Sequence, residues 1–261
     1  MAKPQNPTSI MKYFFLFISL SIALFSCQSA TEVKSTPKVA VQQKTPISLP
    51  HLVRLPTTKT DHPPVIIILH GFGANEQNLH EPLAPYFDPR FLVVSLRSPI
   101  ELRPNSYAWY PIEFVEGGLV IQPEEEEKAR QQLLSVIDEV INYYDADKNK
   151  VFLLGFSQGA IMSSTIVMTA PEKIKGAVLL SGQVPLATDK KMAKGTAIEK
   201  VDLFISHGKK DKVIPIQDGR DLKTKLEKVG ATKLIYKEHE GAHQLDGTHL
   251  REVLQWLSTR I

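Results

Sequence analysis

The pentapeptide Gly155-Phe156-Ser157-Gln158-Gly159 constrains the fold of this chain more than any other segment. It follows the apolar run 151–154, which has the composition of a buried strand, and it precedes a helix that we expect to begin at Ala160. A serine between two glycines at such a strand-to-helix turn has a strained backbone and an exposed hydroxyl. The alternative is a glycine-lined turn without chemistry, so Ser157 has to be judged together with its possible partners.

Short apolar runs rich in β-branched residues recur along the chain and alternate with helical patterns. This alternation predicts an α/β fold with a mostly parallel central sheet, flanking helices, and active-site loops at the carboxyl ends of the strands. In the helix expected at 124–144, Pro123 and the glutamates at 124–127 suit a first turn, and a cation site is the alternative. The other expected strands lie at 65–69, 91–96, 177–180, 203–205 and 234–236, and the other expected helices at 218–229 and 250–257.

A serine nucleophile needs a base to take its proton and an acid to orient that base. In α/β-hydrolases the chain order is serine, then acid, then histidine. Asp211 lies in a loop just past the strand expected at 203–205 and is the candidate acid, with a plain turn aspartate as the alternative. Asp218 is expected to cap a helix, and Asp246 follows the candidate base in the chain.

Three histidines downstream are candidates for the base. His243 lies in a loop of small residues just past the last expected strand, where it can reach the rim of the sheet. His239 continues that strand, so we expect it to pack, and His249 precedes the final helix, where we expect it to be exposed. His243 is therefore the predicted base, and an ordinary loop histidine is the alternative.

The oxyanion of the transition state requires backbone N–H donors. The N–H of Gln158, directly after the nucleophile, is one candidate, and the N–H of Phe72 in the glycine-rich loop 69–75 is the other. His70 in the same loop has no pattern of metal ligands nearby, so we expect it to brace the loop.

Together these motifs resemble the phospholipase/carboxylesterase branch of the α/β-hydrolases, which includes the acyl-protein thioesterases. The resemblance implies that Ser157 is the nucleophile, Asp211 the orienting acid and His243 the base, with Phe72 and Gln158 as oxyanion donors. An aromatic loop containing Trp109 is expected to border the acyl site, unless Trp109 belongs to the core. The resemblance covers about residues 62–258 and rests on segments 69–73, 108–110, 155–160, 180–182, 206–208 and 241–243, together with Asp211 and Pro215.

The first 26 residues are typical of a secretory signal, because Lys12 precedes an apolar run shorter than the roughly 20 residues of a spanning helix. The run ends at Leu24-Phe25-Ser26-Cys27, which resembles a bacterial lipobox, and Cys27 is the only cysteine. We expect a signal peptide at 1–26, a lipidated Cys27 with a flexible tether to 47, and a hydrolase domain at 48–261. An uncleaved anchor helix or an ordinary signal is the alternative, and Met11 competes with Met1 as the start.

The composition excludes several classes of protein. With 43% hydrophobic and 23% charged residues, the chain is neither disordered nor fibrous, and its net charge of +3 does not indicate a nucleic-acid partner. We expect a serine carboxylesterase, anchored by lipid in a bacterial cell envelope, that cleaves a small ester without a metal or cofactor. Thioesters and lysophospholipids are also candidate substrates. A peptidase of the same fold and a catalytically silent surface-anchored binding protein are the alternatives.

Overall fold

The computed structural model describes residues 46–115, 118–186, 192 and 196–261. The chain divides into two compact units, Met1–Gln42 and Gln43–Ile261, and all of the described residues belong to the second unit. The expected signal peptide, Cys27 and the tether as far as residue 45 lie outside the described residues.

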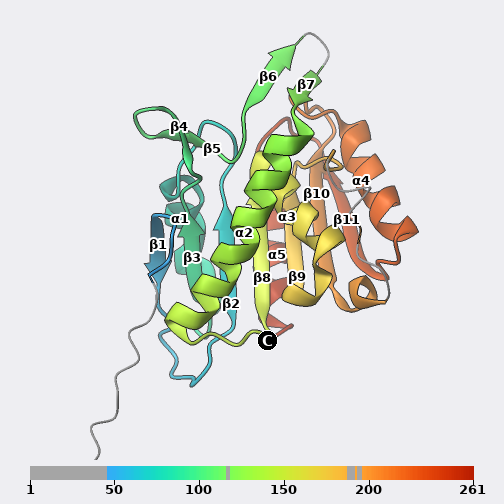
Figure 1. Ribbon diagram of the computed structural model, residues 1–261. Helices are drawn as coiled ribbons and strands as arrows, with labels where there is room; N and C mark the ends of the chain where they lie inside the picture. The colour runs from blue at the N-terminus through green and yellow to red at the C-terminus, as the bar shows by residue number, and fades with distance from the viewer. Residues whose placement is uncertain (1–45, 116–117, 187–191, 193–195) are drawn as a thin grey trace, which may run out of the picture. The chain divides into compact units, whose positions relative to one another are not determined.

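A seven-stranded sheet forms the centre of the second unit, in the order β1-β3-β2-β8-β9-β10-β11 (Figure 1). Every neighbouring pair is parallel except β1 and β3, which are antiparallel. The predicted, mostly parallel α/β sheet is therefore confirmed. The strands are β1 (His51–Arg54), β2 (Val65–Leu69), β3 (Leu92–Leu96), β8 (Val151–Phe156), β9 (Gly176–Leu180), β10 (Asp202–Gly208) and β11 (Lys233–His239).

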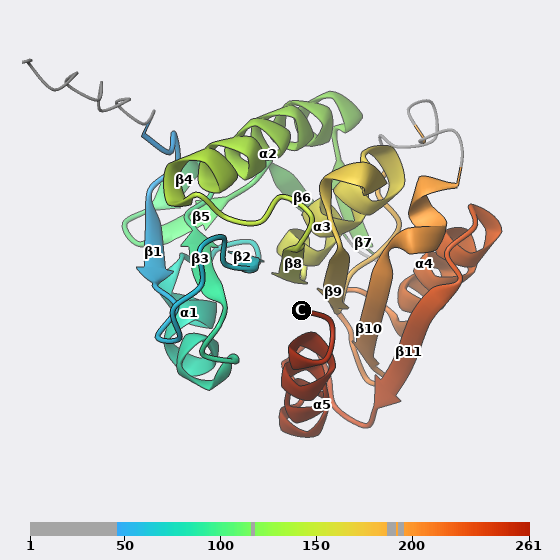
Figure 2. The ribbon, with the colours of Figure 1, turned by 90° about the horizontal axis from the view of Figure 1, so that it is seen from below.

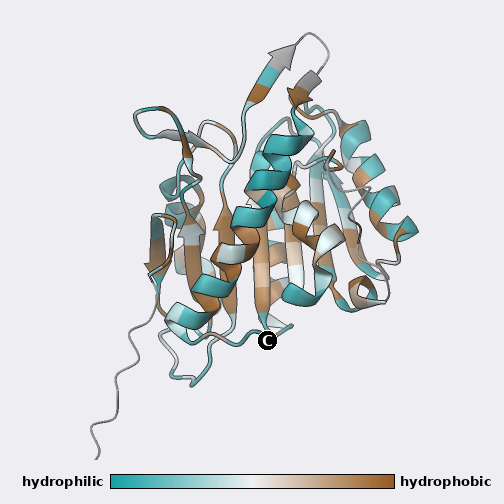
Figure 3. Cartoon of the chain, viewed as in Figure 1, coloured by the Kyte–Doolittle hydropathy of each residue, from teal (hydrophilic) through white to brown (hydrophobic). Residues whose placement is uncertain are grey.

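Helices cover both faces of this sheet (Figures 1 and 2). On one face lie α2 (Pro123–Tyr144), α3 (Gln158–Thr169) and α4 (Ile216–Lys228), and on the other lie α1 (Gln77–Leu83) and α5 (Gly247–Ser258). The two cores divide accordingly: Ile67 packs with the first set of helices, whereas Ile66 and Ile68 pack with the second. Because both faces are buried, the central strands are continuously apolar, as Figure 3 shows, rather than alternating in polarity.

Two small antiparallel hairpins lie on either side of Trp109, where the sequence predicted an aromatic loop. Strand β4 (Ile100–Arg103) pairs with β5 (Ser106–Ala108), and β6 (Ile112–Val115) pairs with β7 (Gly118–Ile121) at the top of Figure 1. Short 3-10 turns at Ala84–Tyr86, Pro171–Lys173 and Ala197–Lys200 complete the described elements.

The helix expected near residue 124 is confirmed, with Pro123 as its first residue. Two of its glutamates pair with basic residues one turn further along, Glu125 with Lys128 and Glu127 with Arg130. Glu126 differs from these two, because it is fully buried and accepts a hydrogen bond from the Leu186 N–H at 3.1 Å.

The starts of the last two helices differ from the prediction. Helix α4 begins at Ile216 after its N-cap residue Pro215, which has no capping side chain. Asp218 therefore lies inside the first turn, and the prediction that it caps this helix is wrong. Asp246 caps α5 instead, accepting hydrogen bonds from the N–H groups of Thr248 and His249 at 3.0 and 2.9 Å. His249 therefore lies within the helix and is half-buried, so its predicted exposure is wrong.

Candidate active site

Ser157 stands at the sharp turn between β8 and α3, with φ of 55° and ψ of −120°. The flanking glycines explain how the turn closes. A Cβ on Gly155 would overlap the carbonyl oxygen of Gly159, and a Cβ on Gly159 would overlap that of Leu69 in β2. The strained backbone at Ser157 therefore depends on the absence of side chains at both positions.

Ser157, His243 and Asp211 meet at the carboxyl edge of the sheet, each from the loop that follows a different strand. Nε2 of His243 lies 2.8 Å from Oγ of Ser157, and Nδ1 of His243 lies 2.7 Å from Oδ2 of Asp211. The His243 side chain is 17% exposed and that of Asp211 is fully buried, so only the serine end of the series meets solvent. This arrangement can move a proton away from the Ser157 hydroxyl.

Asp211 is held in its ionised form. Burial opposes its charge, but hydrogen bonds from His243 and from the N–H groups of Ile214 and Val213 outweigh burial and lower the pKa of the carboxyl below its ordinary value. Both N–H groups donate to Oδ1 at 2.9 Å, which leaves Oδ2 for the imidazole. An ionised carboxylate can only accept hydrogen bonds, so Nδ1 of His243 carries the hydrogen and Nε2 presents its lone pair to Ser157.

His207 supports the Asp211 loop, and sequence reasoning did not find it as a site residue. Its fully buried ring has Nε2 within 2.8 Å of the Ile214 carbonyl oxygen and 3.5 Å of Oδ2 of Asp211. A Cβ on Gly219 of α4 would overlap the His207 ring, so the helix packs directly against it. In the sequence, His207 belongs to segment 206–208, which contributes to the family resemblance, and it lies at the end of a buried strand, but neither feature indicates this role.

The loops that contain Asp211 and His243 are also joined by a backbone hydrogen bond. The N–H of Lys210 donates to the Gly241 carbonyl oxygen at 3.0 Å. A Cβ on Gly208 would overlap the carbonyl oxygen of Ala242, so these two backbones approach more closely than a side chain allows. This contact fixes the spacing between the acid and the imidazole.

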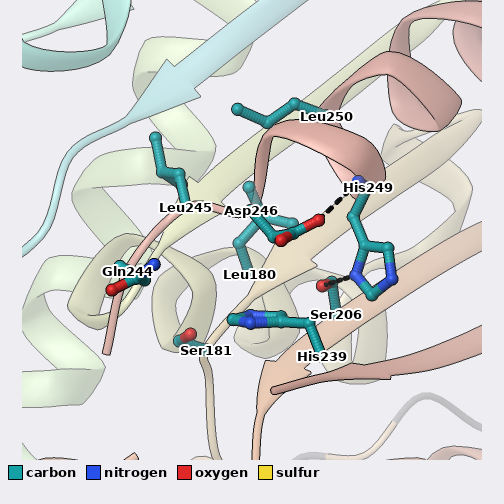
Figure 4. A pocket seen from close by; sticks show the side chains of 9 residues that line it. All are labelled: Leu180, Ser181, Ser206, His239, Gln244, Leu245, Asp246, His249 and Leu250. Carbon is teal, nitrogen blue, oxygen red and sulfur yellow. Dashed lines mark hydrogen bonds between the residues drawn. The ribbon is translucent and has the colours of Figure 1, made fainter. Parts of the chain in front are cut away.

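His239 and His249, the other two histidine candidates, lie together in a small polar cluster (Figure 4). Nδ1 of His249 lies 2.6 Å from Oγ of Ser206, and its ring meets that of His239 edge-on at 5.5 Å. His239 packs as predicted, and its Nδ1 accepts from the Gly241 N–H at 3.2 Å. The cavity inside the cluster measures about 10 Å³, so neither histidine is placed to act on an organic substrate.

His70 braces the loop between β2 and α1, as expected. The buried ring donates from Nδ1 to the Gly71 carbonyl oxygen at 2.8 Å and accepts at Nε2 from the Ser98 N–H at 3.1 Å. Burial lowers the pKa of His70, which keeps it neutral and keeps both contacts compatible.

A cavity of about 350 Å³ opens beside Ser157 and His243. Phe72 and Leu79 line it from the loop and helix after β2, Phe156 lines it from the end of β8, and Leu245 lines it from the loop after β11. Asn78 and Gln244 add polar groups to its wall.

Trp109 is not among the residues lining this cavity. It is 3% exposed and belongs to the core between the sheet and α2, which is the alternative that the sequence left open. Its backbone N–H nevertheless donates to the side chain of Gln158 in the Ser157 turn, and its indole N–H donates to the carbonyl oxygen of His70. A direct contact with substrate stays a prediction.

Within residues 46–115, 118–186, 192 and 196–261, no three His, Cys, Asp or Glu side chains are arranged to hold a metal ion. In the same residues no helix is both long enough and apolar enough to cross a membrane.

Comparison with known proteins identifies the family. Residues 51–261 match the phospholipase/carboxylesterase family model. The Bacillus subtilis protein MhqD is 25% identical over 76% of this chain and 94% of its own length. Acyl-protein thioesterase 1 of Debaryomyces hansenii is 27% identical over 50% of this chain and 56% of its own.

A solved structure agrees with these sequence matches. The Bacillus cereus carboxylesterase superposes with a TM-score of 0.70 at 25% identity, covering 82% of this chain and 95% of its own. The predicted fold, family and ester-hydrolase class are thus confirmed. The chain belongs to the phospholipase/carboxylesterase family and is an esterase-type hydrolase of the α/β-hydrolase fold.

Proposed function

We propose that the protein hydrolyses carboxylic esters through an acyl-enzyme formed on Ser157, with His243 as the general base and Asp211 as the orienting acid. The observation that carries the proposal is the unbroken series of contacts from Ser157 Oγ to His243 and from His243 to the ionised Asp211, at 2.8 and 2.7 Å. The serine end of this series opens into the cavity of about 350 Å³, where an ester can bind.

In the first half of the reaction, Ser157 Oγ attacks the carbonyl carbon while Nε2 of His243 takes the hydroxyl proton. Asp211 stabilises the imidazolium that forms and keeps the ring oriented. The tetrahedral intermediate then collapses, the C–O bond to the alcohol breaks, and His243 returns its proton to the leaving oxygen. The acyl group stays on Ser157 as an ester.

The N–H groups of Phe72 and Gln158 are the proposed donors to the oxyanion. Phe72 lines the cavity beside Ser157, and Gln158 is the first residue of α3. The first N–H groups of a helix have no partners within it, and they form the positive end of its dipole. Loss of one such donor lowers kcat by about 10²–10³ in a well-studied protease.

In the second half, a water molecule takes the place of the alcohol. His243 removes its proton, the water oxygen attacks the acyl carbon, and Ser157 leaves with the proton that His243 returns. The open cavity supports this step because solvent reaches the His243 side of the acyl group.

The dimensions of the cavity favour a small ester. A volume of about 350 Å³ lies near the lower end for small-molecule sites, and its walls combine aromatic and aliphatic side chains with two amides. We therefore propose short acyl groups as the preferred substrates, with longer chains extending into solvent.

The proposal is tested with purified protein and p-nitrophenyl esters of increasing acyl length, next to a Ser157→Ala variant. We expect the wild type to hydrolyse short esters and the variant to lose turnover while keeping its melting temperature. Equal rates in the two proteins would exclude Ser157 as the nucleophile. Activity restricted to peptides would favour the peptidase alternative.

We also propose that the chain is exported and anchored to a membrane by lipid on Cys27. The sequence supports this, since the cysteine follows an apolar run preceded by Lys12 and is the only one in the chain. Two or more acyl chains suffice for stable anchoring. Metabolic labelling with palmitate in a bacterial host should depend on Cys27, and labelling that persists in Cys27→Ser would refute the anchor.

A further inference from the structure

We infer that the side chains of Gln158 and Trp109 form a bracket that sets the spacing of the two oxyanion donors. The inference rests on the proposed function, since it concerns the same donors. The Gln158–Trp109 bracket, as we call this pair, connects the turn after β8 to the loop after β2, which lie on neighbouring strands.

The Gln158 side chain uses both ends of its amide. Its Oε1 accepts from the backbone N–H of Trp109 at 3.0 Å, and its Nε2 donates to the carbonyl oxygen of Tyr110 at 2.7 Å. The residue is 1% exposed, so water does not compete for either bond. The residue whose backbone N–H is a proposed donor is therefore fixed to the segment 109–110.

The indole of Trp109 reaches the second donor's loop. Its Nε1 donates to the carbonyl oxygen of His70 at 3.0 Å, and its ring lies 5.8 Å from the His70 ring. One residue, Gly71, separates this anchored carbonyl from the N–H of Phe72. One residue, Trp109, thus contacts the Ser157 turn through its backbone and the oxyanion loop through its side chain.

Strand β5, just before Trp109, holds the far end of the same loop. The N–H of Gly73 donates to the carbonyl oxygen of Tyr107 at 2.8 Å, and the N–H of Tyr107 donates to that of Ala74 at 2.9 Å. Phe72 therefore lies between two anchored positions, His70 and Gly73, that are both bonded to the segment 107–109.

This arrangement predicts a particular kinetic effect. The donors contact the oxyanion, which develops only in the transition state, so a change in their spacing lowers kcat rather than raising KM. Trp109 is buried and does not line the cavity beside Ser157, so its replacement leaves the lining of that cavity in place. Trp109 and the Gln158 side chain are positioning residues.

The deciding variant is Trp109→Phe, which removes the Nε1–H donor and keeps an aromatic ring. The chain offers a matched control in its other tryptophan. Trp256 in α5 is 6% exposed and packs against Phe204 on the opposite face of the sheet. We expect kcat to fall about 10- to 100-fold in Trp109→Phe with KM within about twofold. In Trp256→Phe, kcat should stay within about twofold of wild type.

A second readout is the inhibition constant of an alkyl boronic acid, which forms a tetrahedral adduct on the serine. This constant should rise in Trp109→Phe by about the same factor as kcat falls. If the folded variant keeps kcat within about threefold of wild type, or if the two tryptophan variants lose kcat equally, the bracket is refuted.

Gln158→Met provides the second test, because it removes both side-chain bonds but keeps the backbone N–H. If Trp109→Phe does not fold, the kcat of Gln158→Met decides by the same criteria.

If no ester is hydrolysed by the wild type, the rate of Ser157 labelling by an alkyl fluorophosphonate, followed by mass spectrometry, replaces kcat. Wild-type labelling with equally fast labelling of Trp109→Phe would overturn the bracket alone. A wild type that neither turns over nor labels would overturn the proposed function and the bracket together.

Discussion

Replacing Asp211 with asparagine changes one oxygen to an amide nitrogen and thereby reverses the role of His243. In the wild type, Oδ1 of Asp211 accepts the N–H groups of Val213 and Ile214, both at 2.9 Å, while Oδ2 faces Nδ1 of His243 at 2.7 Å. The asparagine oxygen has to stay with the two N–H donors, because an NH₂ group there would meet them donor to donor. Its NH₂ group therefore points at His243.

His243 then becomes an acceptor at Nδ1, and its hydrogen moves to Nε2, which faces Ser157. In this tautomer Nε2 has no lone pair with which to take the serine proton. The same change in a protease triad lowers kcat by about 10⁴, and at about 1.36 kcal/mol for each factor of ten this is about 5.4 kcal/mol of activation free energy. KM should change little, since Asp211 does not line the cavity.

The assay is steady-state hydrolysis of a short p-nitrophenyl ester, with thermal unfolding to confirm that the two Oδ1 contacts still hold the loop. Asp218→Asn is the matched control, because this carboxyl lies in the first turn of α4 and should leave kcat within about twofold of wild type. A loss below tenfold in Asp211→Asn, or a larger loss in Asp218→Asn, would refute the tautomer argument.

Three further outcomes can be measured. Gly159→Ala should cost at least about 3 kcal/mol of unfolding free energy and abolish turnover, because its Cβ would overlap the Leu69 carbonyl; a stable, active variant in a urea titration would contradict this. Asp246→Ala should lower the unfolding free energy by about 1 kcal/mol through loss of the α5 cap, and an unchanged melting temperature would be inconsistent with that cap. Burial, partly offset by the charge of Asp246, lowers the pKa of His249 below its ordinary 6.5. The unfolded chain therefore binds a proton at this histidine more readily than the folded protein does, so the unfolding free energy decreases as pH falls below about 6.5. The drop in unfolding free energy from pH 7.5 to pH 5.5 should be smaller in His249→Gln, and an equal drop would show that His249 is not responsible.

The triad candidates were accessible from sequence because each follows a recognisable strand. Parallel strands place their carboxyl ends at one edge, so residues just past residues 154, 205 and 236 are expected to lie close together. The structure brings Ser157, Asp211 and His243 together at that edge, within hydrogen-bond distance.

Strand β1 and the strands of the two hairpins show no such apolar pattern in the sequence. Strand β1 lies at the edge of the sheet with Val53 exposed, so it lacks the continuous apolar run that marks the central strands. The hairpin strands are only three or four residues long, too short for a periodicity to emerge.

The orientation of Trp109 is decided by contacts with residues distant in the sequence. An aromatic residue beside a catalytic loop can face either the substrate or the core. Here Gln158 and His70, 49 and 39 residues away, hold it in the core, and no local pattern reports such contacts. The same holds for His207, whose bond to Ile214 depends on how the chain turns after β10.

The distance along the chain between Ser157 and His243 has a consequence for folding. The two residues are separated by 86 positions, and β9, β10 and β11 lie between them in the chain and are neighbours in the sheet. Sheets built from such non-local parallel pairings fold slowly compared with helical bundles. Recovery of hydrolysis during refolding should therefore lag behind the recovery of helical circular dichroism, because turnover requires the completed pairing of β11 with β10.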